Sequence, residues 1–300
     1  MTVVELEQAL LRTRSGTECV TLIAQYFGSH GLEFGHGTDN SADEAYWLVR
    51  SRQTWNDAAF ETVPEPALIP DLADLARRRV TERKPLAYLL GEAWFAGLRF
   101  SVDERVLVPR SPLAEVIARQ FKPWCRLGEG DRVLDLGTGS GCLAIATAHY
   151  CPGVLVDAVD VSAGAIEVAN RNVAAHDLVD RVRVIQSDLF AGIEYPYRVI
   201  VSNPPYVPES RLAELPREYA HEPAQALAGG KNGLSLVARI LGESPQYLMA
   251  DSVLIMEVGE AQEALTTEYP GLPITWLEFE HGGEGVFVLT RDELTGYLAG

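Results

Sequence analysis

The sequence predicts an α/β fold in which a doubly wound, mostly parallel sheet of seven strands follows a small helical domain. Two observations support this prediction. Apolar residues recur at helical spacing over roughly the first hundred residues, whereas short β-branched runs alternate with helical stretches after Gly130. The chain has 300 residues, a length that suggests about two domains. We expect a helical domain at residues 1–86, a β-hairpin junction at 87–110 and the sheet domain at 111–300.

Three helices are predicted in the first domain. Residues 19–27 place their apolar side chains on one helical face. Residues 41–44 read Ser-Ala-Asp-Glu, a capping box that opens a second helix. Residues 63–70 contain three prolines and predict a loop, after which residues 71–83 resume a helix.

The hydrophobic period shortens to that of a strand between residues 87 and 108. Two glycines, Gly91 and Gly97, interrupt this run, a pattern typical of a β-hairpin. The apolar residues of the predicted hairpin are Tyr88, Trp94, Phe95, Phe100 and Val102. Ser111 is then expected to cap a helix that begins with Pro112 and continues through Phe121.

Seven strands and four helices are predicted after Gly130. The strands are residues 132–136, 155–160, 181–186, 198–202, 252–258, 274–279 and 285–290. The helices among them are residues 142–150, 163–175, 234–248 and 261–269. Strands that alternate with helices build a mostly parallel sheet. The last two strands leave no room for a helix between them, so we expect them to pair as an antiparallel hairpin.

The charge balance limits the kind of partner the protein can hold. Asp and Glu number 42 against 25 Lys and Arg, which gives a net charge of −17. Proteins that grip nucleic acid through its phosphates usually present a basic surface. This balance therefore argues against a nucleic-acid partner recognised directly. It permits a basic protein partner, or it serves solubility alone.

Cysteine spacing and hydropathy indicate the compartment. Cys19, Cys125, Cys142 and Cys151 lie far apart, so neither a zinc site nor a disulfide framework is expected, and we expect no metal. The first ten residues have no apolar segment of the kind found in signal peptides. No apolar run reaches the ~20 residues that span a bilayer. We therefore expect a reduced, cytoplasmic protein without a membrane partner.

A glycine-rich turn follows the first predicted strand of the sheet domain. Its residues are Asp135, Leu136, Gly137, Thr138, Gly139, Ser140 and Gly141. Glycine permits a tight turn and a close approach of the backbone to a ligand. Such a turn alone could bind a dinucleotide or nothing, but its Gly-x-Gly-x-Gly spacing differs from that of pyrophosphate sites. Asp135 would repel a pyrophosphate and suits a cationic amino-acid moiety.

Two further acids follow the next two predicted strands. Asp160 closes the second strand, where an acid in nucleotide-binding folds accepts hydrogen bonds from ribose hydroxyls. Asp188 follows the third strand and could accept a hydrogen bond from an adenine amino group. Each acid alone could be a solvated loop residue. Together with the glycine turn they predict one ligand-binding crevice at the carboxyl ends of the strands.

The sequence Asn203-Pro204-Pro205-Tyr206 ends the fourth strand and is the most specific element of the chain. The prolines restrict the loop, so the carbonyl oxygens of the Asn203 side chain and of Pro204 can converge on one point. Two such acceptors suit a planar –NH2 group, with its nitrogen lone pair directed toward an electrophile and the Tyr206 ring covering it. The alternative is an ordinary Pro-Pro turn after a strand.

Together these residues resemble those of class I S-adenosylmethionine-dependent methyltransferases of the Asn-Pro-Pro-Tyr type, which have a Rossmann-like sheet. That type includes adenine-N6 DNA methyltransferases and protein N5-glutamine methyltransferases. The rest of the chain resembles the second group. The residues that carry this likeness are 83–89, 94–95, 106–110, 221–223, 226–227, 229–230 and 257–259.

Shorter signatures point to one branch of that family. Release-factor methyltransferases usually continue Pro-Arg with Pro-Glu/Asp-Thr-Glu, whereas residues 111–115 here read Ser-Pro-Leu-Ala-Glu. With residues 35–40 and 279–287, this segment resembles the branch that methylates one glutamine of large-subunit ribosomal protein three. Methylation of release factors stays open as an alternative, and adenine-N6 methylation of DNA is a weaker one.

The resemblance implies a cofactor and roles for the site residues. S-adenosylmethionine is the implied methyl donor and S-adenosylhomocysteine the product. The glycine turn with Asp135 is expected to hold the methionine part, Asp160 the ribose, and Asp188 with Leu189 the adenine. The expected cofactor-binding residues are Asp135, Gly137, Thr138, Gly139, Ser140, Gly141, Asp160, Val161, Asp188, Leu189 and Asn203. The expected catalytic residues are Asn203, Pro204, Pro205 and Tyr206.

The same resemblance implies the partner. It is a basic ribosomal protein of the large subunit, either free or in an assembling particle, and the helical domain is expected to select it. No general base is needed, because an amide loses its proton easily once it is methylated. His36, His221 and His281 are therefore expected to be structural.

Overall fold

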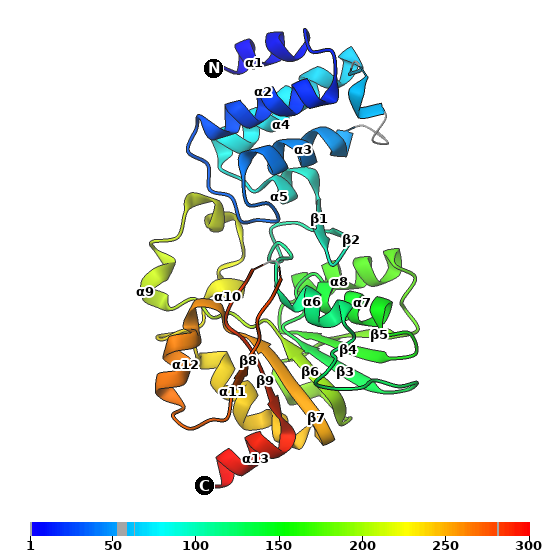
Figure 1. Cartoon of the computed structure of the whole chain (residues 1–300), viewed down its shortest axis with the longest axis vertical. Helices are drawn as coiled ribbons and strands as arrows, with labels where there is room; N and C mark the ends of the chain where they lie inside the picture. Colours follow the sequence, from blue (N-terminus) through cyan, green and yellow to red (C-terminus); the bar gives the residue numbers. More distant parts are fainter. Residues whose placement is uncertain (1, 53–58, 63, 281) are drawn as a thin grey trace. The chain divides into compact units, whose positions relative to one another are not determined.

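The computed structural model describes residues 2–52, 59–62, 64–280 and 282–300 (Figure 1). Val63 and His281, which belong to the predicted loop and to the predicted structural histidines, lie outside the described residues. The chain forms two compact units. One consists of Met1–Glu92 with Pro216–His221, and the other of Ala93–Leu215 with Glu222–Gly300. No local sequence pattern predicts that residues 216–221 belong to the first unit.

The first unit is helical. Its α-helices are α1 (Val3–Leu10), α2 (Gly16–Gly28), α3 (Ser41–Arg52), α4 (Ile69–Glu82) and α5 (Leu86–Leu90). Short 3₁₀ turns occupy Ala59–Glu61, Pro66–Leu68 and Arg217–His221. The apolar face predicted for α2 is buried through Cys19, Ile23 and Phe27, which pack into the core of this unit. The unit is thus built from amphipathic helices whose apolar faces meet.

Two local predictions in this part of the chain are wrong. Ser41 does not cap α3, because the side chain of Asn40 accepts hydrogen bonds from the amides of Ala42 and Asp43 at 3.0 and 2.9 Å. Asparagine one residue upstream satisfies the free amides, so Ser41 joins the helix. Tyr88 lies in α5 and not in the hairpin, which is limited to β1 (Glu92–Phe95) and β2 (Leu98–Ser101).

A buried ion cluster joins the helices of the first unit to the returning segment. The guanidinium of Arg79, which is 1% exposed, donates to Glu44 Oε1 at 2.8 Å and to Glu218 Oε1 at 3.1 Å. It also donates to the carbonyl oxygen of Glu33 at 2.6 Å. Arg83 adds a second cation 3.1 Å from Glu218. Buried charges need this degree of pairing, because an unpaired one is costly to desolvate.

The second unit contains the predicted seven-stranded sheet. Its strands are β3 (Arg132–Leu136), β4 (Leu155–Asp160), β5 (Val182–Gln186), β6 (Tyr197–Ser202), β7 (Leu248–Glu257), β8 (Thr275–Trp276) and β9 (Val286–Thr290). Their order is β5-β4-β3-β6-β7-β9-β8. The first five strands are parallel, and β9 runs antiparallel to both β7 and β8. The predicted fold and its final antiparallel hairpin are confirmed.

Helices cover both faces of this sheet (Figure 1). The α-helices of this unit are α6 (Leu113–Ala118), α7 (Cys142–Tyr150), α8 (Ala163–Ala175), α9 (Glu209–Leu212), α10 (Ala224–Leu227), α11 (Ser235–Glu243), α12 (Gln262–Glu268) and α13 (Arg291–Ala299). On one face α11, α12 and α13 bury Val237, Leu265 and Leu294 against strand residues. None of the described helices is long and apolar enough to cross a membrane.

Several boundaries in the second unit differ from expectation. The helix after Ser111 begins at Leu113 and not at Pro112, and Pro112, not Ser111, occupies its N-cap position without a side-chain capping hydrogen bond. It ends at Ala118, because Gln120 and Phe121 adopt left-handed backbone angles (φ +57° and +62°). The helix predicted for residues 234–248 ends at Glu243, and the long strand β7 begins at Leu248. Strand β8 keeps only two of the six predicted residues.

The strand order places the site. The neighbouring strands β3 and β6 lie at the centre, and the chain crosses from β3 outward to β4 and β5 before it returns as β6. The order therefore reverses beside β3. In open α/β sheets ligands bind beyond the carboxyl ends of the strands at such a reversal. The glycine turn follows β3, and Asn203 follows β6.

Candidate active site

A crevice lies beyond the carboxyl ends of β3, β4, β5 and β6. It is lined on the sheet side by Gly137, Thr138, Gly139, Ser140, Cys142, Leu143, Val159, Asp160, Val161, Ser187, Asp188, Leu189, Asn203 and Pro205. Nine of the eleven expected cofactor residues line the crevice, all except Asp135 and Gly141. Asp135, Gly141, Pro204 and Tyr206 do not line it.

The glycine turn takes backbone angles that only glycine adopts readily. Gly137, Gly139 and Gly141 have φ of +75°, +54° and +83°. A Cβ on Gly137 or Gly139 would meet no protein atom within 4 Å, so the space beside them is open. A Cβ on Gly141 would lie 3.3 Å from the Ile145 side chain, so this glycine lets α7 begin close to its neighbours. The turn presents bare backbone to a ligand.

Asp135 lies beneath this turn and not in the crevice. Its side chain is fully buried, and Oδ2 accepts hydrogen bonds from Thr138 Oγ1 at 2.6 Å and the Ala144 amide at 3.1 Å. Burial raises the pKa of this carboxyl to about 7, against the opposing effect of the Thr138 and Ala144 hydrogen bonds. Oδ1 has no hydrogen-bond partner among the described residues. The carboxyl thus ties β3 and the turn to the first turn of α7.

Asp160 also holds the turn, from the end of β4. Its Oδ2 accepts from the Gly139 amide at 2.9 Å, and Oδ1 accepts from the Ser162 amide at 2.9 Å. Burial raises the pKa of the carboxyl, and the backbone hydrogen bonds oppose that shift. Since each carboxylate oxygen can accept a second hydrogen bond, Asp160 can also receive two hydroxyl groups from the crevice. The side chain of Val161 beside it is 49% exposed.

Asp188 has a partner that the sequence did not indicate. The guanidinium of Arg239, on α11, donates to both carboxylate oxygens at 2.9 and 3.2 Å. Both side chains are exposed, so the pair is screened by water and contributes little stability. Leu189 next to it is buried and has φ +47°, which turns the chain sharply at the edge of the crevice.

The Asn-Pro-Pro-Tyr loop follows β6, at the other end of the crevice from Asp188, which follows β5. Asn203 is half-buried and lines the crevice together with Pro205, whereas Pro204 is buried. The Tyr206 hydroxyl donates to Glu257 Oε1 at 3.0 Å. The crevice therefore brings the Asn203 side chain into the same space as the glycine turn and Asp160.

The second wall of the crevice was not expected to be functional. It consists of residues 105–111 with Pro223, Gln225, Ala226 and Leu236. Glu222 holds this wall: its carboxylate pairs with both terminal nitrogens of Arg110 at 2.7 and 2.6 Å and accepts from the Val108 amide at 3.1 Å. Residues 106–110 and 221–223 carry the family likeness, which is the signal that could have identified the wall.

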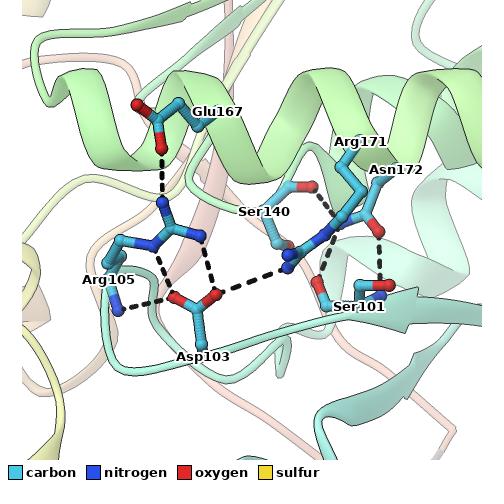
Figure 2. A network of polar contacts seen from close by, with 7 residues as sticks. All are labelled: Ser101, Asp103, Arg105, Ser140, Glu167, Arg171 and Asn172. Atoms are coloured by element: carbon cyan, nitrogen blue, oxygen red, sulfur yellow. Dashed lines mark hydrogen bonds and ion pairs between the residues drawn. The ribbon is translucent and has the colours of Figure 1, made fainter.

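A polar network fixes the start of this wall to α8 (Figure 2). The side chain of Asn172, 1% exposed, accepts from the Ser101 amide at 2.8 Å and donates to the carbonyl oxygens of Ser101 and Ser140 at 3.0 and 2.8 Å. Asn172 therefore joins strand β2 to the glycine turn, since Ser140 belongs to that turn.

Exposed charges extend the same network toward the crevice (Figure 2). Arg105 pairs with Asp103 through two contacts of 2.8 and 2.9 Å and with Glu167 of α8 at 2.5 Å. The hydrogen bonds from Arg105 are the main reason that the pKa of Asp103 is lowered to about 2. Arg105 thus enters the crevice lining with its guanidinium already engaged.

Nothing in the described residues forms a metal centre, since no group of three or more His, Cys, Asp or Glu side chains could hold an ion. The crevice instead combines open backbone at a glycine turn, a carboxylate at Asp160 and an amide at Asn203. This set can bind hydroxyl and amino groups, and it offers hydrogen-bond acceptors to a second, amide-bearing molecule.

Known proteins are similar to this chain in sequence. The family model for the methyltransferase small domain matches residues 114–260. The ribosomal protein uL3 glutamine methyltransferase of Bordetella pertussis is 46% identical over 269 residues, which cover 88% of this chain and 90% of that protein. Its counterpart in Francisella tularensis is 44% identical over 275 residues, covering 90% and 88% of the two chains.

A third relative has the same name. The ribosomal protein uL3 glutamine methyltransferase of Neisseria meningitidis serogroup A is 42% identical over 275 residues, covering 90% of this chain and 91% of that protein. The family and the branch expected from the short signatures are confirmed. The chain belongs to the ribosomal protein uL3 glutamine methyltransferase family.

Proposed function

We propose that this protein transfers a methyl group from S-adenosylmethionine to the side-chain amide nitrogen of one glutamine in ribosomal protein uL3. The proposal rests on the likeness to the three relatives over about nine tenths of the chain. The observation that carries its chemistry is the crevice, in which Asn203 shares one space with Gly137, Gly139 and Asp160.

The crevice residues fit S-adenosylmethionine. The open space beside Gly137 and Gly139 admits a ligand against bare backbone, and Asp160 keeps acceptor capacity for two ribose hydroxyls. Asp188 and Leu189 would border the adenine. When bound, S-adenosylmethionine supplies a methyl group on a positively charged sulfur, which is an electrophile. In this proposal Asp135 acts indirectly, because it shapes the turn from below.

The Asn-Pro-Pro-Tyr loop would hold the glutamine. The lone pair of an amide nitrogen is delocalised into its carbonyl group, so the nitrogen is a weak nucleophile. Hydrogen bonds from its two N–H groups to the Asn203 side chain and the Pro204 carbonyl would favour positive charge on nitrogen and orient the amide. Positioning and charge stabilisation would then supply most of the rate. Pro205 would fix the loop, and Tyr206 would cover the planar amide.

The proposal also assigns the remaining parts of the chain. Residues 1–86 would select the protein substrate, 87–110 would form the junction, and 111–300 would carry out the transfer. The net charge of −17 would speed the encounter with a basic ribosomal protein, whether free or in an assembling particle. We place the reaction in the cytoplasm, with no membrane partner and no direct reading of nucleic-acid sequence.

A transfer assay with labelled S-adenosylmethionine tests the proposal. Three acceptors run in parallel: unmethylated uL3, an unmethylated peptide-release factor and duplex DNA. The wild type is compared with Asn203→Ala and with Asn170→Ala. Asn170 is an exposed asparagine on α8 whose side-chain amide donates to the Ile166 carbonyl of the same helix. We expect label in uL3, mapped to one glutamine, and its loss in Asn203→Ala alone.

Each other outcome has a defined meaning. Label in the release factor would keep the chemistry and overturn the acceptor. Label in DNA would overturn the argument from net charge. Near-normal turnover by Asn203→Ala would remove that residue from the mechanism.

A further inference from the structure

A buried carboxylate connects the Asn-Pro-Pro-Tyr loop to the second wall of the crevice. Glu257, at the end of β7, is 5% exposed. Its Oε1 accepts a hydrogen bond from the Tyr206 hydroxyl at 3.0 Å, and its Oε2 accepts one from the Ser111 hydroxyl at 2.5 Å. Tyr206 belongs to the loop after β6, whereas Ser111 belongs to the second wall. Each carboxylate oxygen therefore contacts a different segment of the chain.

The geometry at Ser111 favours donation from both hydroxyls to Glu257. The Ser111 hydroxyl accepts from the Leu113 amide at 3.1 Å, just before α6, so its single proton can point at Glu257. Burial raises the pKa of Glu257, and the Ser111 and Tyr206 hydrogen bonds and the Arg110 guanidinium oppose that rise. In its ionised form the carboxylate can only accept, and both hydroxyls then donate to it.

Three glycines pack closely against the ring and the backbone of Tyr206. A Cβ on Gly259 would lie 2.6 Å from ring carbon Cε2. Cβ atoms on Gly229 and Gly233 would lie 2.7 Å from the Tyr206 Cα and 2.3 Å from its carbonyl oxygen. Ring, backbone and hydroxyl are therefore each held by a different partner. Such close approach is possible only where the neighbours lack side chains.

We propose that Glu257 and Ser111 are positioning residues that set the Tyr206 ring over the acceptor site by tying its hydroxyl to the opposite wall. The inference rests on the proposed function and deepens it, since it says how the Asn-Pro-Pro-Tyr loop is kept in its working geometry. It also limits the role of Tyr206. Its hydroxyl is committed to Glu257, so the ring face and not the hydroxyl meets the substrate.

Removal of either hydroxyl tests the inference. Tyr206→Phe deletes the hydrogen bond from Tyr206 to Glu257 and keeps the ring. Ser111→Ala deletes the hydrogen bond from Ser111 to Glu257 and also the acceptor of the Leu113 amide. We expect each to lower kcat about tenfold, the usual effect of losing one such bond, while the Kd for S-adenosylhomocysteine stays unchanged. Because both bonds meet at Glu257, the double variant is expected to be little worse than the worse single variant.

Matched controls separate positioning from general loss of packing. Tyr150→Phe deletes a hydroxyl that donates to the Ala96 carbonyl at 2.8 Å, outside the crevice lining. Ser51→Ala deletes one that donates to the Leu48 carbonyl at 2.7 Å in the first unit. Neither is expected to change kcat. Glu257→Gln is the conservative variant, since an amide can accept from one hydroxyl and donate to the other, and it should keep more activity than Glu257→Leu.

Hydrogen exchange gives a readout that does not depend on the acceptor. The Val207 amide, next to Tyr206, donates to the Leu227 carbonyl at 3.0 Å. We expect its exchange to become about tenfold faster in Ser111→Ala and in Tyr206→Phe, and to stay unchanged in Tyr150→Phe. Wild-type kcat together with wild-type exchange in Ser111→Ala would overturn the inference.

The two proposals fail differently. If the wild type transferred no label to uL3, the proposed function would be refuted. The exchange of the Val207 amide would still test whether Glu257 and Ser111 position Tyr206. If the wild type were active and the two hydroxyl deletions lowered kcat additively, as independent sites do, the shared role of Glu257 would be refuted.

Discussion

Replacement of Asn172 by alanine removes three hydrogen bonds at once from a site with almost no access to water. The Ser101 amide, the Ser101 carbonyl and the Ser140 carbonyl would each lose their side-chain partner (Figure 2). At about 1 kcal/mol for each net hydrogen bond, the loss is about 3 kcal/mol of folding free energy. In a unit of this size that corresponds to a Tm lower by about 6–12 °C.

Calorimetric unfolding measures this effect, and Asn170→Ala is the matched control. Asn170 lies on the same helix, is exposed, and donates to the Ile166 carbonyl at 2.9 Å, so its loss should change Tm by no more than about 2 °C. Asn172→Asp should be worse than Asn172→Ala at neutral pH, because a buried carboxylate would face two carbonyl oxygens. Equal Tm values for Asn172→Ala and Asn170→Ala would refute the reasoning.

Three further predictions follow from the crevice. Arg110→Met leaves the buried Glu222 carboxylate without its guanidinium and should cost about 3–5 kcal/mol in urea unfolding, with recovery when Glu222→Gln is added; no recovery would contradict the pairing argument. Asp160→Ala should weaken S-adenosylhomocysteine binding at least tenfold, about the effect of one lost hydrogen bond to a charged group; calorimetry with unchanged Kd would remove Asp160 from the site. Burial raises the pKa of Asp135 to about 7 from 3.8, so the folded chain keeps a proton that the unfolded chain releases. The stability of the wild type relative to Asp135→Asn should therefore fall between about pH 4 and pH 7, by at most about 1.4 kcal/mol per pH unit, and parallel pH profiles would contradict it.

The parts of the site that lie within one stretch of chain were predictable. Gly137 and Gly139 encode their own positive φ, so the turn after β3 can be read directly from the residues. The alternation of strands and helices likewise set the place of Asp160 and Asn203 at the ends of β4 and β6. These features depend on local backbone preferences and on hydrophobic period, which single sequences carry.

The partners across the fold could not be predicted. Arg239 lies 51 positions from Asp188, Glu222 lies 112 from Arg110, and Glu257 lies 146 from Ser111. The sequence holds 42 acidic residues, and nothing local separates the few that become buried from the many that stay in water. The pairing is a consequence of the tertiary fold.

Local errors had the opposite cause, which is competition between neighbouring signals. Ser41 and Asn40 can both cap α3, and the amide side chain of Asn40 takes the position one residue earlier. At the end of α6, the periodic apolar pattern runs on through Phe121, but left-handed backbone at Gln120 turns that side chain into the core from outside the helix. In each case a boundary shifted while the element itself survived.

The return of Pro216–His221 to the first unit has a consequence for anyone who wishes to exchange substrate specificity between relatives. A chain shortened to begin at Ala93 would keep every residue of the crevice lining, yet it would also keep Glu218, a carboxylate built to be enclosed by Arg79 and Arg83. Residues 1–92 therefore cannot be exchanged on their own. A functional chimera has to carry two pieces from the same parent, residues 1–92 and residues 216–221, so that the acid and its arginines travel together.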